Sequence, residues 1–128
     1  MAEKFYLCRK CGNMVGLIKN GGGVLSCCGV SMEELVPDSV DAAHEKHVPV
    51  VSYNATASTA TVTVGSVAHP MQTEHYIEWI HLKTQNGAQM RHLKPGDEPK
   101  AEFKLSAGDT PQAAFAYCNL HGLWKQDI

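Results

Sequence analysis

Alternation between apolar and polar residues dominates the chain from residue 47 onward. In TATVTVG (59–65) every second side chain is apolar, and AEFKL (101–105) repeats this pattern. A period of two is typical of a strand that buries one face. Four further segments predict strands from apolar runs or weaker alternation: 50–53, 76–82, 88–93 and 113–118. Several short strands, separated by turns and without a helical period, predict a small β-sandwich.

The first 36 residues follow a different pattern. Two short β-like runs, 14–18 and 24–25, are separated by three glycines at 21–23, which predict a turn. Below about 40 residues a segment rarely buries enough core to stay folded, and a metal or disulfide usually supplies the missing stability. The polar residues 37–46 predict a linker. We therefore expect a small metal-stapled domain at 1–36, followed by a second domain at 37–128 that begins with this linker.

Composition narrows the class of partner. The chain of 128 residues is 44% hydrophobic and 19% charged, with a net charge of −2 and no basic run. These values fit a globular protein and favour neither nucleic acid nor a membrane surface as partner, so we expect a small molecule or another protein. The N-terminal residues lack an apolar core followed by a cleavage site, so we expect a cytoplasmic protein.

The five cysteines indicate metal or redox chemistry, because disulfides are rare in a reducing compartment. Cys8 and Cys11 form a C-x-x-C pair, and Cys27 and Cys28 are adjacent. Four thiolates make a credible tetrahedral site, and zinc ribbons use similar spacing. Because neighbouring residues of a strand point to opposite faces, the backbone has to bend at the second pair. The residues predict a bound metal here and leave zinc and iron both open.

The histidines provide a second set of candidate ligands. Five residues fall at predicted strand ends or in loops: His47, His69, His75, Cys118 and His121. A rigid sandwich presents binding groups at such places. A single histidine there is most often only a solvated polar residue, but the joint pattern is stronger. Neutral imidazoles suit ferrous iron, and a thiolate donates charge to the position opposite it. We interpret His44, His81 and His92 as ordinary surface or packing residues.

Together the motifs CRKCG, SCCG, HEKHVPV, VAHPM, EHYIEW and CNLHGLW resemble desulfoferrodoxin, the family of two-centre superoxide reductases. The similarity covers nearly the whole chain, in the family's order and with no departure at a ligand position. It implies an all-β protein in which a desulforedoxin-like domain with an Fe(Cys)4 centre precedes an immunoglobulin-like domain. It also implies a second iron held by His47, His69, His75 and His121, with Cys118 axial and the sixth position open.

The same resemblance implies an enzyme that reduces superoxide by one electron to hydrogen peroxide. Lys46 is then expected to attract superoxide to the iron, and Glu45 to be the sixth ligand of the resting ferric form. Without the resemblance, we would interpret Lys46 as a solvated lysine and Glu45 as an acidic residue of the linker. The electron has to come from outside, and the resemblance implies a rubredoxin-type donor and a homodimer.

Two other classes of function stay open at this stage. A non-catalytic electron-transfer protein would have a coordinatively closed second iron site, so added azide would not perturb its spectrum. A zinc-stabilised binding module would be colourless, and metal analysis would identify it.

Overall fold

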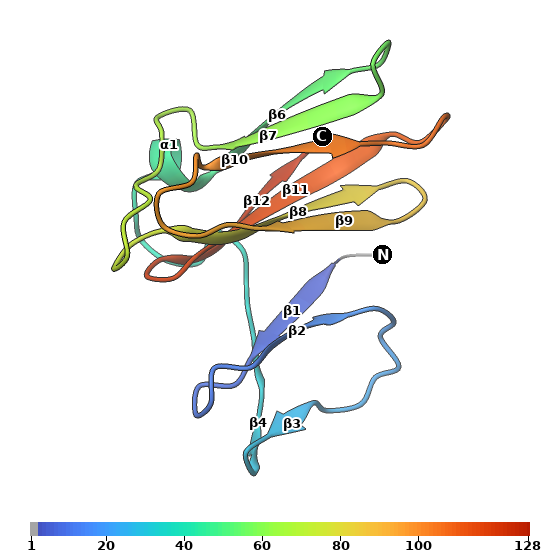
Figure 1. Ribbon diagram of the computed structural model, residues 1–128. Coiled ribbons are helices and arrows are strands. Elements are labelled where there is room, and N and C mark those ends of the chain that lie inside the picture. The colour runs from blue at the N-terminus through green and yellow to red at the C-terminus, as the bar shows by residue number, and fades with distance from the viewer. Residues whose placement is uncertain (1–2) are drawn as a thin grey trace. The chain divides into compact units, whose positions relative to one another are not determined.

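The computed structural model describes residues 3–128, and its regular secondary structure is almost entirely β-strand (Figure 1). It divides into two compact units, Met1–Val36 and Pro37–Ile128, which we name unit 1 and unit 2. The predicted all-β class is confirmed, since the single helix of the described residues is α1 (His44–His47), one turn long. None of the helical structure in residues 3–128 has the length and apolar character needed to cross a membrane.

Unit 1 contains a three-stranded sheet and a short hairpin. In the sheet, β1 (Lys4–Leu7) is central and pairs antiparallel with β2 (Met14–Leu17) and β5 (Glu33–Glu34). The hairpin joins β3 (Ser26–Cys27) to β4 (Val30–Ser31). The core of unit 1 is small, and its buried hydrophobic residues are Phe5, Leu7, Cys8 and Leu35. So little buried apolar surface favours stabilisation by a bound metal.

The prediction of a strand at 24–25 is wrong. These residues lie in the loop before β3, and the Val24 side chain is 79% exposed. The paired residues begin at Ser26, opposite Ser31 at the end of β4, and beyond them the Leu25 carbonyl oxygen still accepts a hydrogen bond, from the Met32 amide at 2.9 Å. Two adjacent apolar residues therefore do not indicate a strand when regular pairing stops beside them.

Unit 2 is a sandwich of two antiparallel sheets, as predicted. One sheet has the order β10-β7-β6 and the other β12-β11-β8-β9. The strands are β6 (Pro49–Asn54), β7 (Thr59–Val64), β8 (Ile77–Thr84), β9 (Ala88–His92), β10 (Lys100–Lys104), β11 (Pro111–Cys118) and β12 (Gly122–Asp127). Sheets of three and four strands with this order give the immunoglobulin-like arrangement.

The core of unit 2 lies between the two sheets and follows the predicted alternation. Along β7 the side chains of Ala60, Val62 and Val64 are fully buried, whereas the threonines between them are half-buried. Phe103 of β10 and Leu82 of β8 belong to the same core. The inward face of each sheet is thus set by its period-two pattern.

Two elements of unit 2 were not predicted. β12 pairs with β11 along its whole length, although GLWKQD shows no regular alternation. α1 takes up the end of residues 37–46, for which we predicted a linker running into the sandwich, and continues to His47. This segment is attached to β12, because the Asp38 amide donates to the Leu123 carbonyl oxygen at 2.9 Å and the Lys125 amide donates to Asp38 Oδ1 at 3.1 Å. A single helical turn is held by such contacts rather than by its own sequence pattern.

Candidate metal centres

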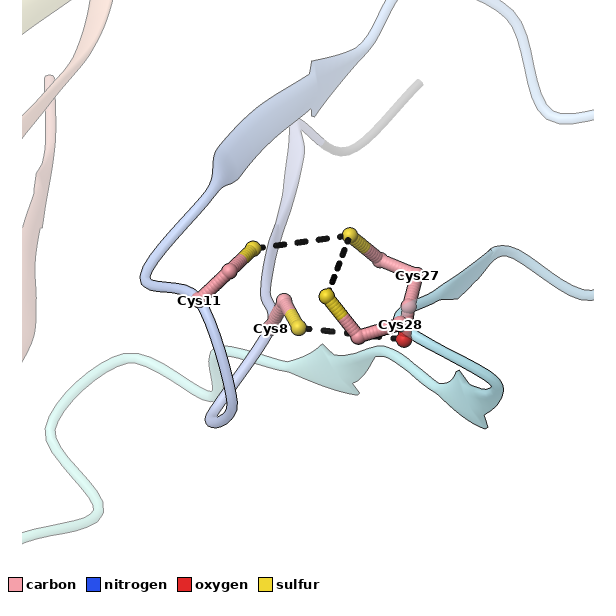
Figure 2. Close-up of side chains that lie close together, drawn as sticks. All are labelled: Cys8, Cys11, Cys27 and Cys28. Atoms are coloured by element: carbon pink, nitrogen blue, oxygen red, sulfur yellow. Dashed lines mark hydrogen bonds between the residues drawn. The ribbon is translucent and has the colours of Figure 1, made fainter.

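The four cysteines of unit 1 converge on one point (Figure 2). Their sulfur atoms all lie within 4.8 Å of one another. The Sγ atom of Cys27 is 3.6 Å from that of Cys11 and 3.9 Å from that of Cys28. A tetrahedron with metal–sulfur bonds of about 2.3 Å has edges of about 3.8 Å. The separations therefore suit a single tetrahedral ion.

A tight turn gives the adjacent cysteines their convergence. Cys28 and Gly29 form the two-residue loop of the β3–β4 hairpin, with φ of 54° and 76°. Two left-handed residues in succession define the type I′ turn, which normally prefers Asn-Gly. This is the backbone bend that the adjacent pair requires. A cysteine in a strained left-handed position is unusual, and its convergence with three other sulfurs supplies the reason.

The first pair is held by its own loop. The Gly12 amide donates to the Cys8 carbonyl oxygen at 2.8 Å, and the Asn13 amide points to Cys11 Sγ at 3.4 Å. A backbone N–H group from Cys11 lowers the pKa of the Cys8 thiol to about 7. Hydrogen bonding with the Cys11 sulfur raises the pKa of Cys28 to about 12. One thiol is thus readily ionised while another resists, and four thiolates need a cation to coexist.

The five other candidate ligands gather at one end of the unit 2 sandwich. His47 ends α1, immediately before β6, and His69 lies in the loop after β7. His75 precedes β8, and Cys118 and His121 flank the turn from β11 to β12. The strand register places all these termini at the same end, since Pro49 pairs with Val64 and Cys118 pairs with both Ile77 and Gly122. His47 alone departs from the prediction of a loop or strand end, because it is carried by a helical turn.

The four imidazoles form a closed ring. Neighbouring ring centroids are 4.6 Å (His47–His69), 4.7 Å (His69–His75), 5.0 Å (His75–His121) and 4.9 Å (His47–His121) apart. Each neighbouring pair is nearly perpendicular, whereas the diagonal pair His47–His75 is 6.3 Å apart and tilted by 30°. The nitrogens of His47, His75 and His121 and the Cys118 sulfur all lie within 4.8 Å of one another.

Nitrogen–nitrogen distances give the size of this ring. His47 Nε2 lies 3.0 Å from His121 Nδ1 and 3.2 Å from His69 Nε2. A square with such edges has its centre about 2.2 Å from each corner, close to metal–imidazole bonds of about 2.0–2.1 Å. The Cys118 sulfur lies beside these nitrogens, 4.0 Å from His121 Nδ1. The donors thus surround a volume of the size of one metal ion.

Backbone carbonyls fix the tautomers of two imidazoles. His47 Nδ1 donates to the Ala43 carbonyl oxygen at 2.6 Å, and His69 Nδ1 donates to the Pro70 carbonyl oxygen at 2.7 Å. A neutral ring with its proton on Nδ1 has a lone pair on Nε2. The two Nε2 atoms, 3.2 Å apart, therefore face each other with lone pairs and no proton between them. A shared cation turns this repulsion into coordination, and carbonyl partners of this kind are usual behind metal-bound histidines.

The protonation states of the ligands agree with this reading. Burial lowers the pKa values of His47 and His75, and it lowers the pKa of His69 to about 4, so these rings are neutral near pH 7. Burial raises the pKa of the Cys118 thiol, which a bound metal would deprotonate. His75 Nε2 is buried without a hydrogen-bond partner among the described residues. A buried nitrogen of this kind needs a proton donor or a metal.

Two contributors to the site lie within the motif CNLHGLW, but we assigned them no role from the sequence alone. Asn119 ties the turn after Cys118 to the segment of His75, because its Oδ1 accepts the Tyr76 amide at 2.9 Å and its Nδ2 donates to the Glu74 carbonyl oxygen at 3.1 Å. Trp124 is fully buried, donates to the His121 carbonyl oxygen at 3.0 Å and lies 4.9 Å from the His47 ring. The supporting role of these two residues becomes visible only once the fold is known.

The two predicted charged residues lie beside the ring, on α1. The side chains of Glu45 and Lys46 are exposed, and both precede the buried His47. Besides burial, the charge of Lys46 contributes to lowering the pKa of His75. The charge of Glu45 opposes the effect of burial on the pKa of His47. Both charged side chains therefore act electrostatically on imidazoles of the ligand set.

Comparison with known proteins assigns the family. The family model described as Desulfoferrodoxin matches residues 39–127, and that of the desulfoferrodoxin N-terminal domain matches residues 2–35. The desulfoferrodoxin of Syntrophotalea carbinolica is 49% identical over 99% of both chains. The desulfoferrodoxin of Nitratidesulfovibrio vulgaris is 48% identical over 97% of this chain and 95% of its own.

A solved structure resembles this chain over its full length. The superoxide reductase from Treponema pallidum superposes with a TM-score of 0.84 at 37% identity, over 99% of this chain and 100% of that one. The superoxide reductase of Pyrococcus horikoshii is 33% identical over 66% of this chain and 86% of its own. Matches to both domain models and high identity along the chain lead to one conclusion: this protein belongs to the desulfoferrodoxin family.

Proposed function

We propose that this protein is a superoxide reductase. The observation that carries the proposal is the closed ring of four imidazoles with one buried sulfur beside it, a set of five donors that leaves room for a sixth ligand. Iron bound there would supply one electron per turnover. Superoxide, one electron and two protons give hydrogen peroxide, so atoms and charge balance. The superoxide reductases similar to this chain support the same reading.

We assign the ligands of this centre to His47, His69, His75, His121 and Cys118. The Cys118 side chain is fully buried, whereas His75 and His121 are half-exposed, so solvent reaches the ring from the imidazole side. Four neutral rings and one thiolate leave ferrous iron a single net positive charge, which favours the approach of an anion. A second iron is assigned to the cysteines of unit 1: Cys8, Cys11, Cys27 and Cys28.

We assign different tasks to the two charges on α1. Lys46 is exposed beside the ring and attracts superoxide from solution. Glu45 would supply a carboxylate to an oxidised iron and balance the added positive charge. Both tasks are tested by pulse radiolysis of the reduced holoprotein, with superoxide consumption and peroxide formation followed together.

In this experiment the wild-type protein should form one hydrogen peroxide for each catalytic iron oxidised. Lys46→Ile should slow the second-order reaction with superoxide about tenfold and flatten its dependence on salt, with the iron content unchanged. Glu45→Ala should leave that first step as fast as in the wild type and shift the ferric absorption spectrum. An electron-transfer protein with a closed iron site would react only slowly with superoxide and would keep its spectrum when azide is added, and this outcome would refute the proposed function.

Lys104→Ile is the matched control for Lys46→Ile. Lys104 is exposed at the end of β10 that pairs with Thr59, opposite the end that carries the ligands. The substitution changes the net charge by the same amount. Because Lys104 is far from the ligands, its loss should leave the rate within about twofold of the wild-type rate. An equal loss in both variants would mean that net charge matters and Lys46 has no local role. An unchanged ferric spectrum in Glu45→Ala would remove Glu45 as a ligand.

We also infer a homodimer and an external electron donor. Unit 1 exposes apolar side chains despite its small core, with Ile18 97%, Val24 79% and Val36 57% exposed. Burial of such residues against a second copy is favourable. Sedimentation equilibrium checks the association, and a monomer at micromolar concentration would contradict it.

For the donor we propose a rubredoxin-type protein, which should restore the ferrous state of the oxidised protein in a stopped-flow experiment.

A further inference from the structure

The turn at residues 65–67 is pressed against the backbone of α1. The Glu45 carbonyl oxygen accepts the Val67 amide at 2.8 Å and the Ser66 hydroxyl at 3.3 Å. Pro49 and Val64 form the last pair of the β6–β7 ladder on this side. The hydrogen bonds to Glu45 therefore extend the contact between two segments beyond the end of the ladder. One segment is α1 with β6, and the other is β7 with the turn at 65–67.

Gly65 makes this close approach possible. A Cβ atom at position 65 would lie 2.7 Å from the carbonyl carbon of Lys46 and closer still to the carbonyl oxygen of Glu45. Both obstacles are backbone atoms, which cannot swing aside as the end of a side chain does. Ordinary van der Waals contact begins at 3.4 Å, so any side chain at this position forces the α1 backbone away. Gly65 is itself buried.

Both joined segments carry residues of the proposed active site. Glu45, Lys46 and His47 follow one another on α1. On the other segment the His69 amide donates to the Val64 carbonyl oxygen at 3.1 Å, which closes the loop that contains the turn. The spacing at Gly65 therefore sets where the α1 charges lie relative to the imidazole ring.

We propose that Gly65 is a positioning residue: the absence of its side chain lets residues 65–67 clamp the Glu45 carbonyl and hold Lys46 where it attracts superoxide. The inference rests on the proposed function for the role of Lys46. The clamp itself is a property of the fold and is measured separately. Gly65 touches neither substrate nor metal, and it acts through the backbone that it supports.

The first test measures the clamp without turnover. In the wild-type holoprotein the Val67 amide should exchange slowly with deuterium, although the Val67 side chain is 50% exposed, because Glu45 accepts its hydrogen bond. Gly65→Ala should speed this exchange at least about tenfold, because the displaced carbonyl releases the amide. Gly87→Ala is the control, since a Cβ there meets no atom within 4 Å. Unchanged exchange in Gly65→Ala would refute the clamp.

The second test asks whether Gly65 acts through Lys46. Gly65→Ala should slow the second-order reaction with superoxide about three- to tenfold in the wild-type background, part of the loss expected for Lys46→Ile. In the Lys46→Ile background the same change should cost less than about twofold, because residues that act as a unit are not additive. Equal losses in both backgrounds would show a general disturbance of the site and overturn the positioning role.

A second variant covers the case in which Gly65→Ala does not fold. Val67→Pro deletes the donor of the 2.8 Å hydrogen bond and adds no atom at position 65. It should show the same dependence on Lys46, and its failure to do so would refute the proposal. The two hypotheses fail in different ways. A normal rate in Lys46→Ile alone would remove the proposed task of Lys46, whereas slow Val67 exchange that persists in Gly65→Ala would remove only the clamp.

Discussion

Cys118→Ser should abolish the ferric charge-transfer band of unit 2 and slow superoxide reduction at least about 100-fold. Mutation of residues that only hydrogen-bond to metal ligands already lowers metal affinity or activity about 10–100-fold. A Cys118 thiolate would donate electron density to a bound iron, and a serine hydroxyl would do so far less. Cys118 ends β11 and is fully buried, so serine adds an unpaired hydroxyl that costs about 1–3 kcal/mol. The sandwich should stay folded, because a domain's stability is about 5–15 kcal/mol.

The matched control for this variant is Ala114→Ser. Ala114 lies on the same strand, is fully buried in the core of unit 2 and receives a comparable hydroxyl away from the ligands. It should lower the free energy of unfolding by a similar amount and leave the ferric spectrum intact. Absorption spectra, iron content and thermal unfolding separate the two variants. A Cys118→Ser protein that keeps its ferric band would remove the sulfur from the ligand set.

The strands of the sandwich could be predicted where one face is buried and the other is not. β7 and β10 alternate clearly, because their outward residues remain polar or half-exposed. β12 has its buried residues, Leu123 and Trp124, next to each other and gives no period of two. α1 is a single turn, which has no periodicity to detect. Local pattern therefore identifies an element only when the element's own burial is regular.

The candidate ligands could be predicted because histidine and cysteine are chemically distinctive and lie near strand ends. The carbonyl oxygens of Ala43 and Pro70, which fix the tautomers of His47 and His69, belong to residues whose side chains have no polar group. Gly65 likewise matters for the atoms that approach it and not for its chemistry. Such supports depend on the tertiary fold, so a sequence pattern cannot reveal them.

Loss of the metal from the cysteine site should unfold unit 1 and leave unit 2 folded. Cys28→Ser removes one of four sulfurs and keeps the shape of the side chain at the left-handed turn position. Structural zinc sites in small domains contribute about 10–16 kcal/mol to folding, and an all-sulfur iron site of this kind should act on the same scale. Four buried hydrophobic residues cannot replace that contribution. The amides of β1 and β2 should therefore lose their protection from hydrogen exchange.

Cys118→Ser and Cys28→Ser are reciprocal controls, because each removes one proposed centre. Cys28→Ser should lose one iron per chain, keep the ferric band of unit 2 and keep slow exchange along β8 and β11. Cys118→Ser should keep the protection of β1 and β2. Unit 2 has its own core between two sheets, so it does not need the metal of unit 1 to bury its apolar residues. If β1 and β2 stayed protected in metal-free Cys28→Ser, the small core would suffice and the metal would be needed for its electron chemistry alone.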